Sequence, residues 1–203
     1  KRLNPPDDPA LAPLAGKPVT AEMAGTLDLT AERLDDLTAT LEAADARVRL
    51  DGGADLATGV ADAAIEAEMA KLARFTEAFG FPVDGTAKLQ GHLRAGGDTP
   101  VSGTLTGSLA GTTWPEASLG TLLGPDVALA AEVTTTAEGG TRLDGLLVEG
   151  ANATARGAVA LDAEGTLEGD LALSVPELAG LSEPLGIDLA GDGTLDLALA
   201  GTV

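Results

Sequence analysis

The nine residues LEGDLALSV, at positions 167–175, decide the fold class. Apolar or small residues occupy every second position, and acidic or hydroxyl residues occupy most positions between them. Because successive side chains of a strand point to opposite faces, this stretch predicts a strand with one apolar side. The segments 195–199, 105–109 and 127–133 repeat the pattern. The sequence therefore predicts a mainly β protein with antiparallel strands that bury or shelter a single face.

Glycine-containing stretches separate these segments and predict tight turns. They are Asp51-Gly52-Gly53, Gly96-Gly97-Asp98, Glu138-Gly139-Gly140 and Glu164-Gly165. Glycine adopts the positive φ angles that hairpin turns need. Strands joined by such turns are expected to form a meander, in which each strand pairs with the next one along the chain.

One segment has the period of a helix. From Met69 to Phe79, apolar residues recur at helical spacing, Gly80 stands where a C-terminal cap is expected, and Pro82 follows. We expect a short amphipathic helix here, lying on the sheet as a lid or plug.

The Leu-rich segment and the strand after it recur along the chain. Pro115-Glu116 and Pro176-Glu177 both open a short leucine-rich stretch that ends in Leu-Gly, and the pentapeptide GTLDL stands at both 25–29 and 193–197. We expect one elongated segment of a longer chain, with approximate repeats at 9–68, 69–114, 115–175 and 176–203.

The apolar residues are small, which favours a groove over a sealed interior. The chain has 27 glycines, three Phe, one Trp and no Tyr, whereas packed cores usually contain aromatic residues. Leu, Val and Ala can line a channel without filling it, so the sheet is expected to curl into an elongated groove. The predicted lining residues are Leu27, Leu29, Leu89, Leu93, Leu105, Leu109, Leu129, Val133, Leu171, Leu173, Leu195 and Leu197.

Composition argues against several classes of function. A formal net charge of −20 opposes binding to nucleic acid, and also simple adhesion to anionic lipid head groups. The absence of cysteine excludes disulfides and thiolate chemistry, and the sequence contains neither a signal peptide nor a transmembrane stretch.

Few residues invite a chemical role. His92 is the single histidine and is expected to be an exposed strand residue, while Asp188, Asp192 and Asp196 lack the spacing of a calcium loop. Trp114 and the three Phe are expected to pack rather than bind a ligand. We expect no enzyme activity, no cofactor and no metal site.

The rhythm of a Leu-rich short helix, a glycine, a Gly-Thr-x-x-Leu strand and acidic glycine turns resembles the repeat region of TamB-type translocation and assembly proteins, which are related to AsmA. The bias towards Ala, Leu, Gly and Asp is similar to that of alphaproteobacterial members. The resemblance spans essentially the whole chain and rests on this texture, without an invariant motif.

The resemblance implies a periplasmic protein with a curled β-groove, called a β-taco, anchored in the inner membrane through a segment outside this sequence. It also implies a TamA-like outer-membrane partner. The implied roles are phospholipid transport between the two membranes and assembly of outer-membrane proteins, with acyl chains or unfolded outer-membrane protein strands as guests. The alternative hypothesis is a fragment of an extracellular adhesin or autotransporter passenger, built as a β-solenoid; an enzyme is the third.

Overall fold

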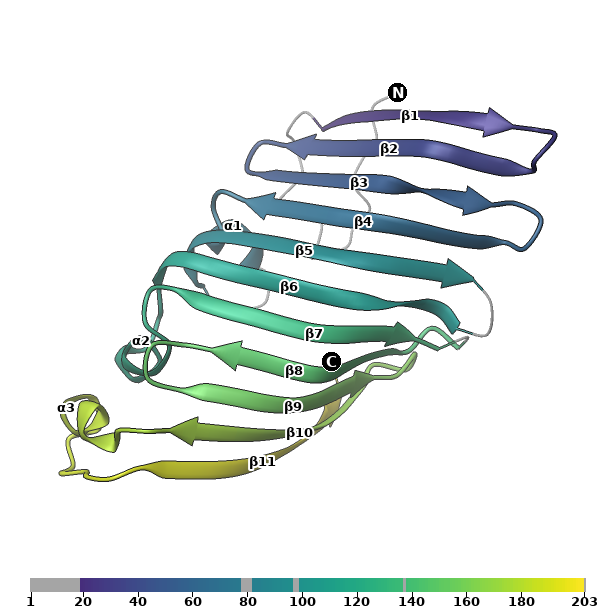
Figure 1. Cartoon of the computed structure of the whole chain (residues 1–203). Helices are drawn as coiled ribbons and strands as arrows, with labels where there is room; N and C mark the ends of the chain where they lie inside the picture. The colour runs from purple at the N-terminus through teal and green to yellow at the C-terminus, as the bar shows by residue number, and fades with distance from the viewer. Residues whose placement is uncertain (1–18, 78–81, 97–98, 137, 203) are drawn as a thin grey trace.

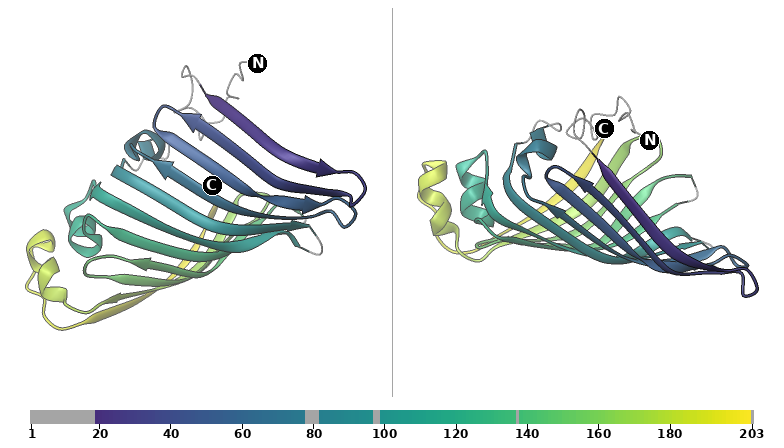
Figure 2. Two further views of the ribbon diagram at one scale, coloured as in Figure 1. Left: turned by 45° about the horizontal axis from the view of Figure 1, so that its top comes forward. Right: turned by 90° about the horizontal axis from the view of Figure 1, so that it is seen from above.

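The protein is a single open β-sheet, seen here in a computed structural model that describes residues 19–77, 82–96, 99–136 and 138–202. The sheet is an 11-stranded antiparallel meander in which each strand pairs with its neighbours in sequence, from β1 to β11 (Figure 1). The predicted mainly β architecture with short helices is therefore confirmed. The strands twist progressively along the sheet, and the two edge strands do not meet (Figure 2).

The strands are 8 to 15 residues long. Their bounds are β1 Thr20–Asp28, β2 Arg33–Ala43, β3 Ala46–Asp55, β4 Val60–Met69, β5 Asp84–Gly96, β6 Thr99–Thr113, β7 Val127–Thr135, β8 Thr141–Glu149, β9 Thr154–Leu161, β10 Thr166–Val175 and β11 Gly193–Thr202.

The helices all lie in connections at one end of the sheet. These connections contain α1 (Ala73–Thr76) after β4, α2 (Ala117–Leu123) after β6, and η3 (Leu178–Leu181) with α3 (Ser182–Leu185) after β10. We call this end of the sheet the helical end, and the opposite end, where β1–β2, β3–β4, β7–β8 and β9–β10 are joined by short turns, the turn end. The boundaries at 69, 115 and 176 that the repeats predict fall where these three connections begin, while the start at residue 9 lies outside the described residues.

The register pairs apolar residues of each strand with apolar residues of the next strand, so that the apolar sides of all strands lie on one face of the sheet. Leu171, for example, stands opposite Gly157 on β9 and Leu197 on β11. One row can be followed from β2 to β7 through Ala39, Leu50, Ile65, Gly91, Leu105 and Ala131. A shift of one residue in any pair would turn that strand's apolar side to the other face, so the matched pattern specifies the register.

Bulges keep the two faces consistent where the sequence departs from strict alternation. On β8, Leu143 pairs with Val159 and Leu146 with Gly157, although the two leucines are three residues apart. Gly145 lies between them with φ of 56°, a left-handed conformation that a side chain would oppose. The extra residue lets both leucines face the apolar side.

The predicted helix from Met69 to Phe79 is only partly correct. Met69 ends β4 and pairs with Ala46 and Ala87, and the helix spans Ala73–Thr76. The period of two in β4 is easily missed because alanines occupy most of its apolar positions. Phe79 and Gly80 lie outside the described residues.

The turn predicted at Asp51-Gly52-Gly53 is wrong. These residues lie inside β3, where Gly52 pairs with Leu37 on one side and Ala63 on the other. A Cβ atom on Gly52 would come within 2.9 Å of the Ala63 Cβ and 2.2 Å of the Asp62 carbonyl oxygen. This glycine therefore permits a close strand approach rather than a turn. The predicted turns at 138–140 and 164–165 are confirmed.

Candidate functional site

The predicted lining residues lie on one face of the sheet, with a single exception. Leu29 follows the end of β1 in the turn to β2 and is 79% exposed. The register places the others on the same side, which we call the apolar floor. They are Leu27, Leu89, Leu93, Leu105, Leu109, Leu129, Val133, Leu171, Leu173, Leu195 and Leu197.

The apolar floor is uncharged along its whole length. Where the described strands pair regularly between bulges, this side holds glycine and aliphatic residues in every strand. The polar exceptions are threonines near strand ends, such as Thr135 and Thr141. A continuous apolar face of eleven strands is much larger than the scattered apolar patches of ordinary soluble surfaces, and such patches mark interaction sites.

Leucines on the floor lie over glycines of the neighbouring strand. A Cβ atom on Gly91 would come within 2.5 Å of Leu105 Cδ2, and one on Gly103 within 2.9 Å of Leu93 Cδ2. Gly157 has the same relation to Leu171, also at 2.9 Å. These three glycines therefore make room for leucine side chains to lie across the neighbouring strand.

Among the described residues, no second layer covers the middle of the floor. None of the described residues has a side chain less than 2% exposed, and most floor positions are half-buried. At the sheet edges Leu27 and Leu195 are 54% and 52% exposed. A sandwich or barrel would have sealed these leucines in a core. In this sheet they remain accessible from one side.

The helices cover only the helical end of the floor. Val175 on β10 packs with Ala153 and Leu181, and Leu122, Leu178 and others pack around this cluster. A Cβ atom on Gly193 would come within 3.1 Å of Leu178 Cδ2, so η3 lies directly over β11 on the apolar side. Figure 2 shows the helices rising on this one side of the sheet. They form a wall along the helical end.

Hydrogen bonds attach α2 to the turn between β8 and β9. The backbone N–H groups of Ala151 and Asn152 donate to the carbonyl oxygens of Leu123 and Leu122, each at 2.9 Å. The Asn152 side-chain amide donates to the Thr121 carbonyl oxygen at 2.6 Å. These bonds satisfy carbonyl groups at the end of α2 that have no partner within the helix. This role of Asn152 could not be predicted from the sequence, because no local pattern links Asn152 to the carbonyl group of Thr121.

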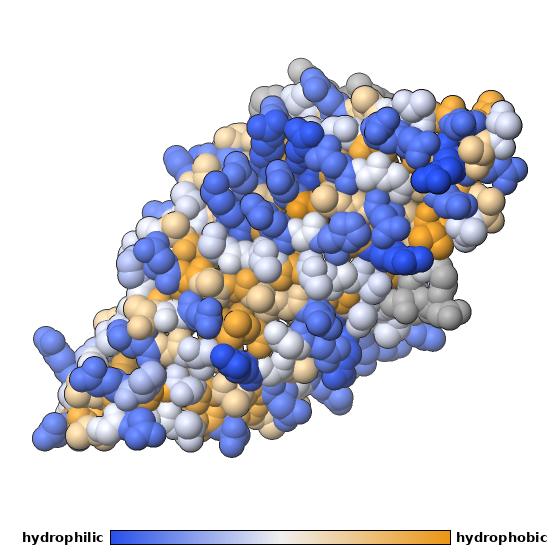
Figure 3. Space-filling view, viewed as in Figure 1, coloured by the Kyte–Doolittle hydropathy of each residue, from blue (hydrophilic) through white to orange (hydrophobic). Residues whose placement is uncertain are grey.

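The opposite face is polar and carries the ion pairs. Figure 3 shows this face, where hydrophilic residues cover most of the surface over β2–β5. Glu42 on β2 pairs with Arg47 on β3, and Glu68 on β4 with Lys88 on β5, at 3.4 and 2.8 Å. Both pairs join residues that stand directly opposite one another in the register. Such cross-strand pairs help to specify which side meets water.

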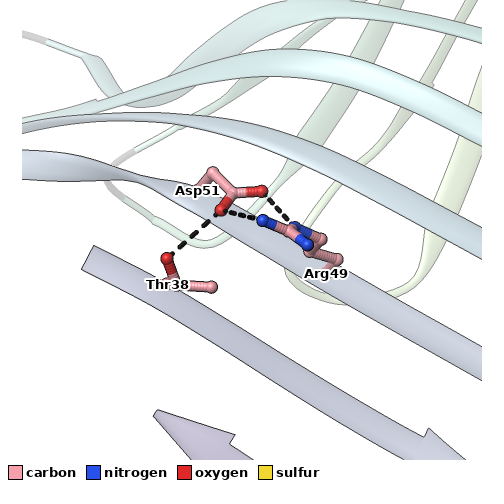
Figure 4. A network of polar contacts seen from close by, with 3 residues as sticks. All are labelled: Thr38, Arg49 and Asp51. Atoms are coloured by element: carbon pink, nitrogen blue, oxygen red, sulfur yellow. Dashed lines mark hydrogen bonds and ion pairs between the residues drawn. The ribbon is translucent and has the colours of Figure 1, made fainter. Parts of the chain in front are cut away.

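A three-residue network on β2 and β3 belongs to the same face. Arg49 donates two hydrogen bonds to Asp51, at 2.6 and 2.9 Å, and the Thr38 hydroxyl donates to Asp51 at 3.3 Å (Figure 4). The hydrogen bond from Arg49 is the main reason why the pKa of Asp51 is lowered. This carboxylate therefore stays charged and keeps β3 facing water on that side.

The residues considered for a chemical role lie where packing or solvent explains them. His92 is exposed on the polar face of β5, as predicted, opposite Thr104. Asp188 and Asp192 lie in the connection before β11 and Asp196 on its polar side, all exposed. The Trp114 indole N–H donates to the Gly124 carbonyl oxygen at 2.7 Å, which holds the end of α2. Phe79 and Phe81 lie outside the described residues.

Within the part of the chain that the structure describes, no helix has both the length and the apolar character needed to cross a bilayer. Comparisons of the chain with family models, with curated proteins and with solved structures give no match.

Proposed function

We propose that this chain is a periplasmic β-groove segment of a TamB/AsmA-like protein that shelters the acyl chains of phospholipids between the inner and outer membranes. The observation that carries the proposal is the apolar floor. Its regularly paired positions are uncharged, it runs through eleven strands, and the described helices cover it at one end only. A protein that only needed a stable core would bury such a face.

The dimensions of the floor suit acyl chains. Ten intervals of roughly 4.8 Å between strands give a floor about 48 Å long. Each methylene group that leaves water for the floor contributes about 0.8 kcal/mol, so a chain of ordinary length gains enough to be held without any polar contact. The surface of leucines over glycines suits guests that slide along it.

The parent protein supplies the rest of the proposed pathway. By its resemblance to the TamB/AsmA-like family, it is anchored in the inner membrane through a segment outside this sequence and has a TamA-like outer-membrane partner. Assistance to the assembly of outer-membrane proteins is part of the same proposal, because an unfolded strand with one apolar side could also lie on the floor. The role is that of a conduit or chaperone, without enzyme activity or cofactor.

The antiparallel pairing of the strands argues against the adhesin alternative. A β-solenoid stacks short coils whose strands pair in parallel, whereas every strand pair here is antiparallel. The observed apolar floor has no role in that architecture.

Photo-crosslinking in cells tests the proposal. A photoreactive residue at Leu105 or Leu171, on the floor, should capture phospholipid. The matched control is Thr106, which neighbours Leu105 in β6 but faces the polar side. Capture at Thr106 alone, or no lipid at either floor position, would reject lipid transport.

A further inference from the structure

Among the described residues, the charges in the turns and connections around the apolar floor are mostly negative. The described part of the turn end carries seven carboxylates in turns, at a bulge or at the last residue of a strand, and most of them are exposed. These are Asp28, Glu32, Asp36, Asp55, Glu138, Asp162 and Glu164. The described cations at this end are Arg33, Arg94 and Arg142, of which Arg33 pairs with Asp35 and Arg142 with Asp144.

The helical end is acidic as well. Its connections expose Glu77, Asp84, Glu116, Asp126, Glu177, Glu183, Asp188 and Asp192. The described cations in the same connections are Lys71 and Arg74, and Arg74 forms an ion pair with Asp45. The floor is therefore bordered by carboxylates along both of its long sides.

The cations of the strands are kept away from the floor. The register places Arg47, Arg49, Lys88, Arg94, Arg142 and Arg156 on the polar face. Four of these six form ion pairs there: Arg47, Arg49, Lys88 and Arg142. No described arginine or lysine of a regularly paired strand faces the floor, so an anionic head group above it would find no cationic side chain on that surface.

Three carboxylates at the turn end are held in the ionised form by the backbone. Asp28 accepts hydrogen bonds from the N–H groups of Ala31 and Thr30, and these bonds lower its pKa. Backbone N–H groups lower the pKa of Asp55 and Asp162 in the same way. The negative border at this end therefore persists below neutral pH.

We propose that the groove selects amphiphiles by head-group charge, taking those with an ammonium group and no net negative charge, such as zwitterionic phospholipids, and disfavouring anionic ones. The inference rests on the proposed function, because it assumes that acyl chains lie on the floor. A strand of nine residues is roughly 30 Å long, so a head group at either side of the floor lies within about a Debye length (~10 Å) of a carboxylate border. No single carboxylate acts as a binding site; the selection arises from their summed field.

Lipid uptake from vesicles tests the inference. The protein would be incubated with fluorescent-lipid vesicles of phosphatidylethanolamine and phosphatidylcholine, or with vesicles in which phosphatidylglycerol carries the label. Labelled lipid retained by the protein would then be measured. We expect about fivefold more retention of the zwitterionic lipid at low salt, and a difference that nearly disappears at 1 M salt, where screening acts within ~3 Å.

A pair of variants locates the effect. The border variant combines Glu138→Gln, Glu164→Gln and Glu183→Gln; the control combines Glu132→Gln, Glu168→Gln and Asp170→Asn, which removes the same charge from the polar face. The border variant should raise retention of phosphatidylglycerol more than the control does. Equal responses of the two, or wild-type retention of phosphatidylglycerol that matches the zwitterionic lipids at low salt, would overturn the charge selection. Retention of neither lipid would instead reject the proposed function.

Discussion

The two ends of the apolar face share one sequence pattern but have different environments. At the helical end Val127 and Val175 are 3% and 5% exposed, and Val175 packs with Leu181 of η3. Farther along the same face Leu197 is 39% exposed. Alternating apolar residues therefore do not by themselves form a core. The short helices add packing contacts at the helical end, while the rest of the face stays exposed.

A charge placed at a buried position of the helical end should have the largest effect on stability. Val127→Asp puts a carboxylate at a position that is 3% exposed and should lower the free energy of unfolding by more than ~3 kcal/mol, enough to disrupt folding. Leu197→Asp, on the open part of the same face, should cost much less because water reaches the new carboxylate. Urea unfolding followed by circular dichroism would compare the two; similar losses would show that the open part is as sealed as the covered one.

Shortening a buried side chain in the connection between β10 and β11 should give the next largest loss of stability. Leu181 is 8% exposed in the cluster with Ala153 and Val175, so Leu181→Ala should cost about 2–4 kcal/mol through lost contacts and a cavity. Leu185 lies in α3 of the same connection but is 51% exposed, and Leu185→Ala should change stability by less than ~0.5 kcal/mol. Thermal unfolding midpoints would check both, and equal shifts would refute the assignment of Leu181 to a supporting cluster.

A methyl-bearing side chain on a floor glycine should have a smaller effect. In Gly91→Val, the new Cβ would lie 2.5 Å from both Leu105 Cδ2 and the Thr104 carbonyl oxygen, so both would have to move away from it. The substitution should lower the free energy of unfolding by about 1–3 kcal/mol. Gly201 has no heavy atom within 4 Å of a Cβ position, so Gly201→Val should be nearly neutral. If both valines proved neutral in urea unfolding, leucines would not lie over glycines on this floor.

Lowering the pH should destabilise the turn end before the rest of the sheet, and the effect should be small. The pKa values of Asp28, Asp55 and Asp162 are lowered by hydrogen bonds in the folded state. Their contribution is therefore fully present above the unfolded-state pKa of about 4 and is lost as pH falls through the lower folded-state pKa.

Amide hydrogen exchange at pH 6 and near pH 3, corrected for intrinsic rates, measures this loss. Protection should decline at Ala31 and Thr166 while the cluster around Val175 is retained. The variant Asp162→Asn should weaken the pH dependence at Thr166. A uniform decline over the whole sheet would contradict a local effect at the turns.

The strands could be predicted from the sequence because their signal is local. Leu171 and Leu173 alternate with polar residues within a few positions, and the register follows once both faces of every strand are known. The segment around Met69 was misread because alanines in β4 weaken the period of two. Gly52 was misread because a glycine in a close strand approach and a glycine in a turn look alike until the partner strand is placed.

The position of the wall of helices could not be predicted, because it depends on contacts between residues that are distant in the sequence. The leucine-rich stretch after Pro115-Glu116 is visible in the sequence, but the bonds that Ala151 and Asn152 donate to the last carbonyl groups of α2 are not. Nor does the alternation of β10 and β11 reveal that Val175 is covered while Leu197 is open. These differences arise from how long each connection is and over which strand it folds back, and the local sequence period carries no information about that.

The pairing of a leucine with a glycine across neighbouring strands also affects how such a sequence can change over time. When Leu93 faces Gly103, or Leu105 faces Gly91, what matters is the combined volume of the two residues. A large and a small residue can exchange places across the pair, and the surface above them keeps its height. Related sequences can thus differ at most positions while they keep a continuous apolar surface, and a position-by-position alignment of them then shows little identity.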